Sequence, residues 1–426
     1  MLKITNLIRR LHSDSLYRNS FYLMASTFVM AGFGFFFWMI NARLFTPEQV
    51  GLATTIISAM GLITSFSLLG LNNGLIRYLP MSERKNDKIS TCFLVTALAI
   101  IIISVIFLVG LKTFSPRLFF IRENLPYALF FIFFMLISSS SNIIESVFIA
   151  FRNTKYILIQ GTIFSILKLI LPFSLVALGA YGIFSSWMLA LTTASSVSFI
   201  VLIKKFGFKP RLVINTNIIK KIGRFSFGNY IAGFLGGLPT MILPLMITNL
   251  INPEKTAYYY MAMMIASLLF IIPQATTQSL FAEGSHDGKE LKQHVKKAAR
   301  IILLILIPAI LITLFLGKYI LLAYGKNYSH EGLRFLQLLA LSSIFVSFNS
   351  IFGTILKIEH KIIELIFISL LSAILIIGLS YLFINRGLLG VGLAWIAGNM
   401  LIGGIYLAYW TLYRHHKEIL NINNLF

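Results

Sequence analysis

Residues 20–42 read SFYLMASTFVMAGFGFFFWMINA, an apolar stretch without a charged side chain. A helix needs about 20 residues to cross the ~30 Å hydrocarbon core of a bilayer, and this stretch is long enough to do so. It is too long for the apolar part of a signal peptide and lacks a convincing small-residue cleavage site. We therefore expect a retained membrane-spanning helix near the start of the chain.

Comparable apolar stretches recur along the rest of the sequence, and they predict about twelve membrane-spanning helices. The short segment between the fifth and sixth stretches, residues 179–182, carries two glycines and is typical of a tight turn. The fold class is therefore all-α, a polytopic membrane protein. The predicted spans are 20–42, 51–76, 89–111, 125–149, 156–178, 181–203, 225–248, 257–281, 301–322, 335–356, 363–384 and 388–412.

The composition supports a membrane protein over a soluble one. The 426 residues are 58% hydrophobic and only 12% charged, with a mean hydropathy of +0.86. Such a chain has too little polar surface to cover a soluble fold of its size. The net charge of +22 would suit a nucleic-acid partner only if a soluble basic domain or an arginine-rich arm were present. Neither is found, so we expect no nucleic-acid partner.

Most of the 36 basic residues fall in alternate gaps between the predicted spans, beginning with the N-terminus. Positive residues near helix ends are retained on the cytoplasmic side, so both termini are expected to be cytoplasmic and the protein to span the plasma membrane. The simplest explanation is that these charges only orient the chain and touch anionic lipid head groups. Contact with a substrate is the alternative.

Two short motifs recur at an offset of 206 residues and divide the chain into halves. Residues 18–21, RNSF, are followed by RFSF at 224–227, and LFTPEQ at 44–49 is followed by LINPEK at 250–255. Each half would hold six helices, and two such halves have the same orientation, related by a pseudo-two-fold axis along the membrane normal. The expected organisation is a cytoplasmic amphipathic segment (1–19), an N-terminal six-helix bundle (20–203), a basic cytoplasmic linker (204–224), a C-terminal six-helix bundle (225–412) and a cytoplasmic tail (413–426).

One basic residue, Lys168, falls well inside a predicted span, about twelve residues from its start. At 1.5 Å per residue this depth is ~18 Å, close to the middle of the bilayer. A lysine there costs at least ~2.5 kcal/mol on insertion scales, so it is expected to face a wet cavity or a partner. A structural ion pair is the alternative, and Glu145 is the acidic candidate.

Helix-breaking residues occupy matching places in the first helix of each half. In transporters built from repeats such segments are pointers to a binding site, because irregular backbone is tolerated where it lines a cavity. Close helix packing through small residues explains them equally well. The gating candidates are Gly32, Gly34, Gly236, Gly237, Pro239 and Pro244.

Polar side chains in the second helix of each half form another candidate group. Asn72 and Asn73 lie in the first half, and Gln274 and Gln278 in the second. They could line a hydrophilic path for sugar hydroxyl groups, and hydrogen bonding between helices is the alternative.

The stretch from Asn19 to Pro80 resembles polysaccharide flippases of the multidrug/oligosaccharidyl-lipid/polysaccharide exporter superfamily. The residues that carry the resemblance are NARLFTPEQVG at 41–51 and GLNNGLIRYLP at 70–80, and the six-plus-six layout extends it over nearly the whole chain.

The resemblance implies two six-helix bundles around a cationic cavity and the transfer of a lipid-linked oligosaccharide between leaflets by alternating access. The substrate would be a polyprenyl-(pyro)phosphate-linked glycan whose tail stays in lipid. Basic groups would offset the burial of its phosphate charge. Lys168 is the first candidate for the anionic head group, with Arg43, Arg77 and Arg152 as rim contacts. Membrane lipids and glycan-assembly proteins are the other candidate partners.

Two other functions remain open. A small-molecule or multidrug exporter of the same superfamily would share this architecture but should need an acidic site in the bundle core, where only Glu145 and Glu364 are candidates. A membrane-embedded glycan polymerase would need an extramembrane catalytic site, and the outward loops are short. The seven histidines are scattered apart from the adjacent pair His415 and His416. We therefore expect no catalytic residues, no metal, no cofactor and no enzymatic activity.

Overall fold

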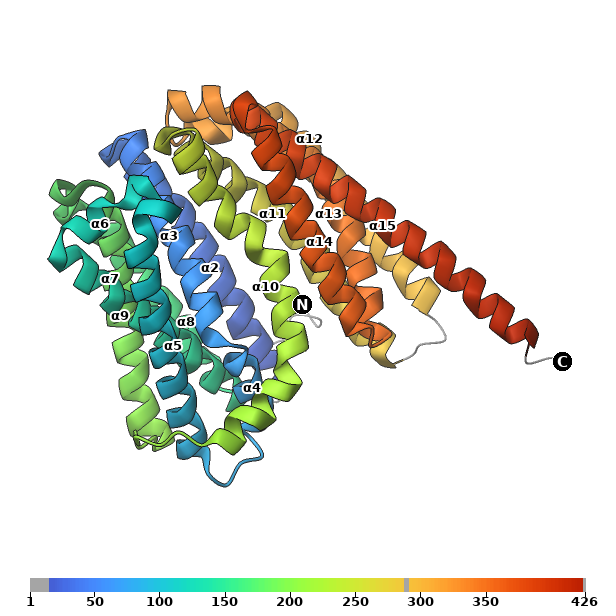
Figure 1. Ribbon diagram of the computed structural model, residues 1–426, viewed down its shortest axis with the longest axis horizontal. Helices are drawn as coiled ribbons and strands as arrows, with labels where there is room; N and C mark the ends of the chain where they lie inside the picture. The colour runs from blue at the N-terminus through green and yellow to red at the C-terminus, as the bar shows by residue number, and fades with distance from the viewer. Residues whose placement is uncertain (1–14, 287–290, 424–426) are drawn as a thin grey trace, which may run out of the picture. The chain divides into compact units, whose positions relative to one another are not determined.

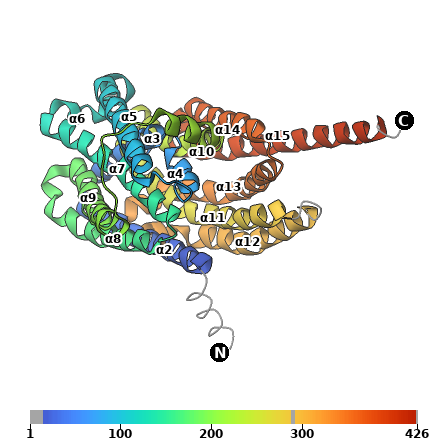
Figure 2. The same cartoon turned by 90° about the horizontal axis from the view of Figure 1, so that it is seen from below.

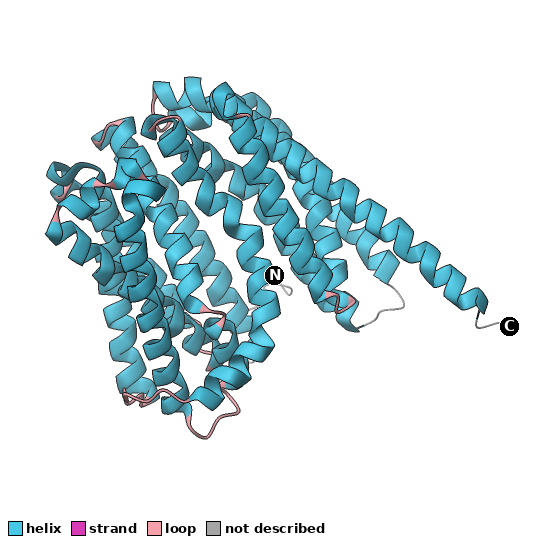
Figure 3. Cartoon of the chain, in the orientation of Figure 1, coloured by secondary structure: helices cyan, strands magenta, loops and turns pink. Residues whose placement is uncertain are grey.

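The computed structural model describes the backbone of residues 15–286 and 291–423. Throughout these residues the chain is helical, with short turns and loops and no strand (Figure 3). Residues 1–14 of the expected amphipathic segment and the last three residues of the expected tail lie outside the described part.

The chain divides into two compact units, Met1–Tyr230 and Ile231–Phe426 (Figure 1). The boundary falls inside a long helix, α10 (Thr216–Leu250). The first unit contains α2 (Ser15–Leu44), α3 (Pro47–Leu68), α4 (Leu71–Tyr78), α5 (Lys85–Phe114), α6 (Phe120–Glu123), α7 (Leu125–Ala150), α8 (Lys155–Ser174) and α9 (Gly179–Phe206), with short 3₁₀ turns at Pro116–Leu118 and Val176–Leu178. The second unit contains α11 (Pro253–His286), α12 (Leu291–Leu322), α13 (Lys326–Ile358), α14 (Ile362–Leu382) and α15 (Gly387–Asn423), with a 3₁₀ turn at Ile384–Arg386.

Twelve helices in the described residues are long and apolar enough to cross a membrane, which confirms the predicted number. Large apolar side chains are exposed on them, such as Phe28 on α2 and Leu304 and Phe315 on α12. On a soluble protein such patches would cost free energy, whereas hydrocarbon is as apolar as these side chains. The outer surface of each unit is therefore suited to lipid.

The prediction of one helix over residues 51–76 is wrong for its last turns. Helix α3 ends at Leu68, and the next two residues, Leu69 and Gly70, both have left-handed backbone angles (φ 49° and 74°). The i→i−4 hydrogen-bond ladder cannot continue through two such residues. Asn72 and Asn73 therefore lie in the short helix α4 and not in the second membrane span.

The repeated sequence motif begins the second spanning helix of each unit. Thr46 caps α3: its hydroxyl accepts a hydrogen bond from the Gln49 amide at 3.3 Å, and Pro47 is the first helical residue. Asn252 does the same for α11, accepting from the Lys255 amide at 2.8 Å ahead of Pro253. A side-chain acceptor followed by proline is a favourable helix start. The two motifs thus have the same structural role.

Within the first unit, α2 and α8 run side by side in the same direction (Figures 1 and 2). Asn19 at the start of α2 accepts hydrogen bonds from the backbone amide and hydroxyl of Thr154, at 3.0 and 2.9 Å. Seven residues further along both helices, Gly161 lies against Ser26, whose hydroxyl would be 2.9 Å from a Cβ atom at Gly161. This close parallel packing fixes which residues of α2 face the second half of α8.

Candidate functional site

Lys168 lies on α8 and is buried, with 2% of its surface exposed. Three aromatic rings surround its ammonium group. The Nζ atom lies 4.7 Å from the centre of the Phe164 ring, 5.1 Å from that of Trp187 on α9 and 5.8 Å from that of Phe37 on α2. We call these three side chains the aromatic cage.

The rings of the cage also contact one another. Trp187 meets Phe37 and Phe164 edge to face, with ring centres 5.5 and 5.3 Å apart. Each aromatic face attracts a cation by ~0.5–2 kcal/mol, with the higher values where water is excluded. The cage therefore replaces part of the hydration that Lys168 loses on burial.

No acidic side chain in the described residues pairs with Lys168. The alternative of an ion pair with Glu145 is thus not what the structure contains. Gly34 on α2 completes the surroundings, because a Cβ atom there would lie 4.0 Å from Nζ of Lys168. A larger side chain at this position would compete with the ammonium group for space.

A second polar cluster lies nearer the start of α8. The amide nitrogen of Gln160 donates to the Ser141 hydroxyl at 2.8 Å and to a carboxyl oxygen of Glu145 at 3.3 Å. Its amide oxygen accepts from the Ser198 hydroxyl at 2.8 Å. Gln160 was missed from the sequence, although a buried glutamine inside an apolar span is itself a signal. Gln160 and Lys168 are eight positions apart, which separates the two clusters by ~12 Å along α8.

The other predicted basic residues do not join Lys168. Arg43 is next to the last residue of α2, nine residues or ~13 Å beyond Gly34. Arg77 is in α4 and stacks on Tyr78 with 5.8 Å from its guanidinium carbon to the ring centre, and Arg152 follows the end of α7. All three arginines are exposed, and Arg43 and Arg152 lie at opposite ends of the first unit. Only Lys168 is inside the bundle.

The predicted polar and gating residues fall on several elements. Asn72 is half-buried and Asn73 exposed on α4, whereas Gln274 and Gln278 are exposed on α11 of the second unit. The gating candidates Gly32 and Gly34 lie within α2, and Gly236, Gly237, Pro239 and Pro244 lie within α10, each of which is one continuous helix in the described residues. Their roles stay predictions.

Metal ions in proteins are held by groups of His, Cys, Asp or Glu side chains. No group of three or more such residues gathers in the part of the chain that the structure describes. The single cysteine, Cys92, is buried in α5 and packs among apolar side chains.

Comparisons with known proteins identify related sequences and folds. The family model described as polysaccharide biosynthesis protein matches residues 16–281, and the MatE family model matches residues 231–382. No curated protein matches the sequence significantly.

Among solved structures, lipid II flippase MurJ in an inward closed conformation aligns with a TM-score of 0.73 at 15% identity, covering 92% of this chain and 87% of that one. A multidrug resistance MATE family transporter of the MOP superfamily aligns in its inward-facing conformation with a TM-score of 0.67 at 14% identity, covering 90% and 94% of the two chains. Its outward-facing conformation gives 0.62 at 14% identity, covering 94% and 95%. These proteins are named as transporters or flippases and not as enzymes. At such identities the likeness shows the fold, which is the expected one with two halves.

Proposed function

The chain belongs to the polysaccharide biosynthesis protein family, and from this premise we propose that it is a flippase that moves a lipid-linked oligosaccharide across the plasma membrane by alternating access. The substrate class is a polyprenyl-(pyro)phosphate-linked glycan, with the tail remaining in lipid while the head group crosses. Both termini are placed in the cytoplasm, following the alternation of basic loops. Glycan-assembly proteins are the proposed partners at the membrane.

The observation that carries this proposal is the buried ammonium group of Lys168, which has no acidic partner among the described residues. A phosphate crossing the membrane loses its hydration and needs a cation in return. A lysine in a fixed ion pair would be neutralised already, whereas one held by aromatic rings keeps its charge available. A charge-assisted hydrogen bond to phosphate is about twice as strong as a neutral one and exceeds a single cation–π contact. The ammonium group has three N–H donors, so a phosphate that accepts more than one of them competes with the three rings of the aromatic cage for Lys168.

The remaining candidate residues have three other roles in this proposal. Arg43, Arg77 and Arg152 are rim contacts for the anionic head group at the two ends of the path. Asn72, Asn73, Gln274 and Gln278 bind sugar hydroxyl groups. The helix-breaking residues of α2 and α10 supply bending during the transport cycle: Gly32, Gly34, Gly236, Gly237, Pro239 and Pro244.

A small-molecule exporter is the second candidate function. Two observations favour it: the MatE family match to residues 231–382, and Glu145, which sits half-buried in the Gln160 cluster without a basic partner in the described residues. A carboxyl group in that setting suits the binding of a proton or another cation. The two functions differ in cargo, so a transport assay separates them.

The test uses purified protein in sealed vesicles that carry a fluorescent oligosaccharide on polyprenyl pyrophosphate. A membrane-impermeant reagent that destroys the outer-leaflet label reports transfer between leaflets. We expect protein-dependent transfer of this lipid and no uptake of cationic dyes. Dye transport with no glycolipid transfer would replace the flippase with the exporter.

A further inference from the structure

The segment between the sixth and seventh spanning helices, α9 and α10, has an ordered path. Helix α9 ends at Phe206, and Gly207 takes left-handed backbone angles (φ 65°), which glycine adopts without strain. The amide of Phe208 then donates back to the Leu202 carbonyl at 3.2 Å, closing the helix end. Residues 207–215, which form neither helix nor strand, are called the strap below.

Short polar side chains at the start of α5 hold the strap in place. The Arg211 amide donates to the Ser90 hydroxyl at 3.1 Å, and the Asn215 amide donates to the Thr91 hydroxyl at 3.3 Å. The Thr91 hydroxyl donates in turn to the Val213 carbonyl at 3.0 Å. These hydrogen bonds satisfy the backbone of an otherwise open segment and fix its side chains relative to α5.

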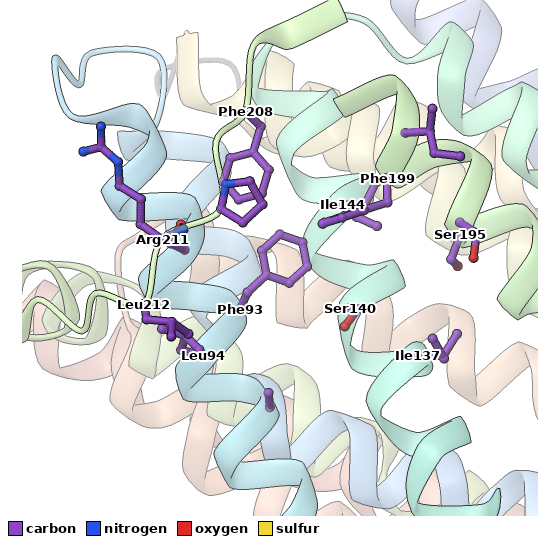
Figure 4. A pocket seen from close by; sticks show the side chains of 15 residues that line it. Phe93, Leu94, Ile137, Ser140, Ile144, Ser195, Phe199, Phe208, Arg211 and Leu212 are labelled. Atoms are coloured by element: carbon purple, nitrogen blue, oxygen red, sulfur yellow. The ribbon is translucent and has the colours of Figure 1, made fainter. Parts of the chain in front are cut away.

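A pocket of about 550 Å³ lies under the strap, between α5, α7 and α9 (Figure 4). Its size is within the ~300–1,000 Å³ range of ligand sites. Phe93, Phe199 and Phe208 form one wall, with ring centres 6.0–6.2 Å apart. Further lining comes from Ile137, Ser140 and Ser195, so the interior is mainly apolar with a few hydroxyl groups. All of these residues belong to the first unit.

Apolar and basic side chains alternate along the strap at the mouth of the pocket. Leu212 is 92% exposed and Ile214 49%, while Lys209 and Arg211 are exposed beside them. Exposed leucine and isoleucine next to cations are typical of segments that lie at the membrane interface, with apolar side chains in the acyl region and charges among head groups. At that level the acyl chain of a bilayer lipid can reach an apolar pocket.

We propose that this pocket binds one acyl chain of an anionic bilayer phospholipid, with the lipid phosphate on Arg211 and Lys209 of the strap. Arg211 pairs with Asp87 through one nitrogen, at 3.1 Å, and a guanidinium group has five N–H donors, so it can hold a phosphate at the same time. Its side chain is 55% exposed, which leaves that face open. The bound lipid joins the strap to the α5, α7 and α9 bundle. This site does not depend on the identity of the transported cargo.

The first experiment maps the acyl chain. Full-length protein in phosphatidylcholine vesicles is photolabelled with phosphatidylglycerol that carries a diazirine on one acyl chain, and the adducts are located by peptide mass spectrometry. We expect adducts to concentrate on residues 90–97, 137–144 and 195–200. Ala97→Trp fills the pocket and should remove them, whereas Leu98→Trp, on the neighbouring exposed position, should leave them in place. Labelling spread evenly over all spanning helices and unchanged by Ala97→Trp would overturn the site.

The second experiment tests the head group with the same probe and its phosphatidylcholine counterpart. One cation near the surface is worth ~1 kcal/mol of attraction to an anionic lipid, so Arg211→Gln should lower the preference for phosphatidylglycerol about fivefold. Asp87→Asn releases Arg211 from its ion pair and should raise the preference. Equal labelling by both lipids in the unaltered protein would overturn the phosphate contact. Displacement of the probe by polyprenyl phosphate, with none by excess phosphatidylglycerol, would overturn the assignment to a bilayer phospholipid.

Discussion

The Nζ atom of Lys168 on α8 lies 5.1 Å from the centre of the indole ring of Trp187 on α9. The ammonium group is thereby held by aromatic faces instead of a carboxylate. Phe164 lies one helical turn earlier on α8, and Phe37 comes from α2, so three helices contribute to the aromatic cage. A cation held in this way is stable in an apolar bundle and remains able to accept an anionic ligand.

Replacing Lys168 by Met should not destabilise the protein. The change removes a buried charge that has no anionic partner in the described part of the chain, and it leaves a flexible side chain that packs well against aromatic rings. We expect a thermal midpoint in detergent equal to or above that of the unaltered protein. Trp187→Ala should instead lower stability, by up to ~3–5 kcal/mol, because it removes one of the three rings of the cage and leaves a void beside Lys168. A large loss of stability in Lys168→Met would mean that the lysine is structural.

Replacing Gln160 by Leu should destabilise the first unit. The Ser198 hydroxyl and the Glu145 carboxyl group would each lose a partner, and an unsatisfied buried polar group costs ~1–3 kcal/mol. The measurement is the thermal midpoint, with Gln278→Leu on an exposed face of α11 as the control. Equal midpoints for the two variants would contradict the role given to Gln160.

The parallel register of α2 and α8 predicts a disulfide. In a Cys92→Ala background, Ser26→Cys with Gly161→Cys places two thiols where the Ser26 hydroxyl and a Cβ at position 161 would be 2.9 Å apart. A sulfur atom in place of the Ser26 hydroxyl would lie within bonding reach of a thiol on that Cβ atom, so mild oxidation should cross-link the pair within one chain. Mass spectrometry of the linked peptides reports the bond. Two freely alkylated thiols after oxidation would show that this register is wrong.

Reporter fusions test the proposed topology. With twelve spans and basic loops retained inside, green fluorescent protein after Phe426 should fluoresce, and alkaline phosphatase at the same place should be inactive. Alkaline phosphatase inserted at Ser115, between α5 and α6, should be active. The opposite pattern would reverse the orientation and with it the assignment of the strap to the cytoplasmic interface.

The sequence contains enough information to predict the number of spans, the two halves and the exceptional position of Lys168. Hydropathy and charge are properties of single stretches, so no tertiary contact is needed to detect them. The partners of Lys168 could not be predicted, because 38 Phe and 4 Trp residues offer many cages and only packing selects Phe37, Phe164 and Trp187. The break at Leu69 and Gly70 was also missed, since leucine rarely takes left-handed angles, although Gly70 and the Asn72-Asn73-Gly74 stretch are turn signals in the sequence.

The contacts of the strap also could not be predicted from the sequence. Its charges predict orientation in the membrane, whereas its hydrogen bonds to Ser90 and Thr91 depend on residues more than a hundred positions away. Short polar side chains near a helix start are common, and the sequence does not indicate which backbone group each of them will bind. The pocket under this segment is therefore visible only in the folded unit.

The most direct test of the central claim is the initial rate at which vesicles containing Lys168 variants transfer the fluorescent polyprenyl-pyrophosphate oligosaccharide between leaflets. Hydrogen bonds to charged groups contribute ~1.5–3 kcal/mol, so Lys168→Met should slow transfer by about tenfold or more. Lys168→Arg should retain more of the rate, and Lys112→Met at the far end of α5 should leave it unchanged. Transfer by Lys168→Met at the rate of the unaltered protein would contradict the claim that this buried ammonium group serves the anionic head group.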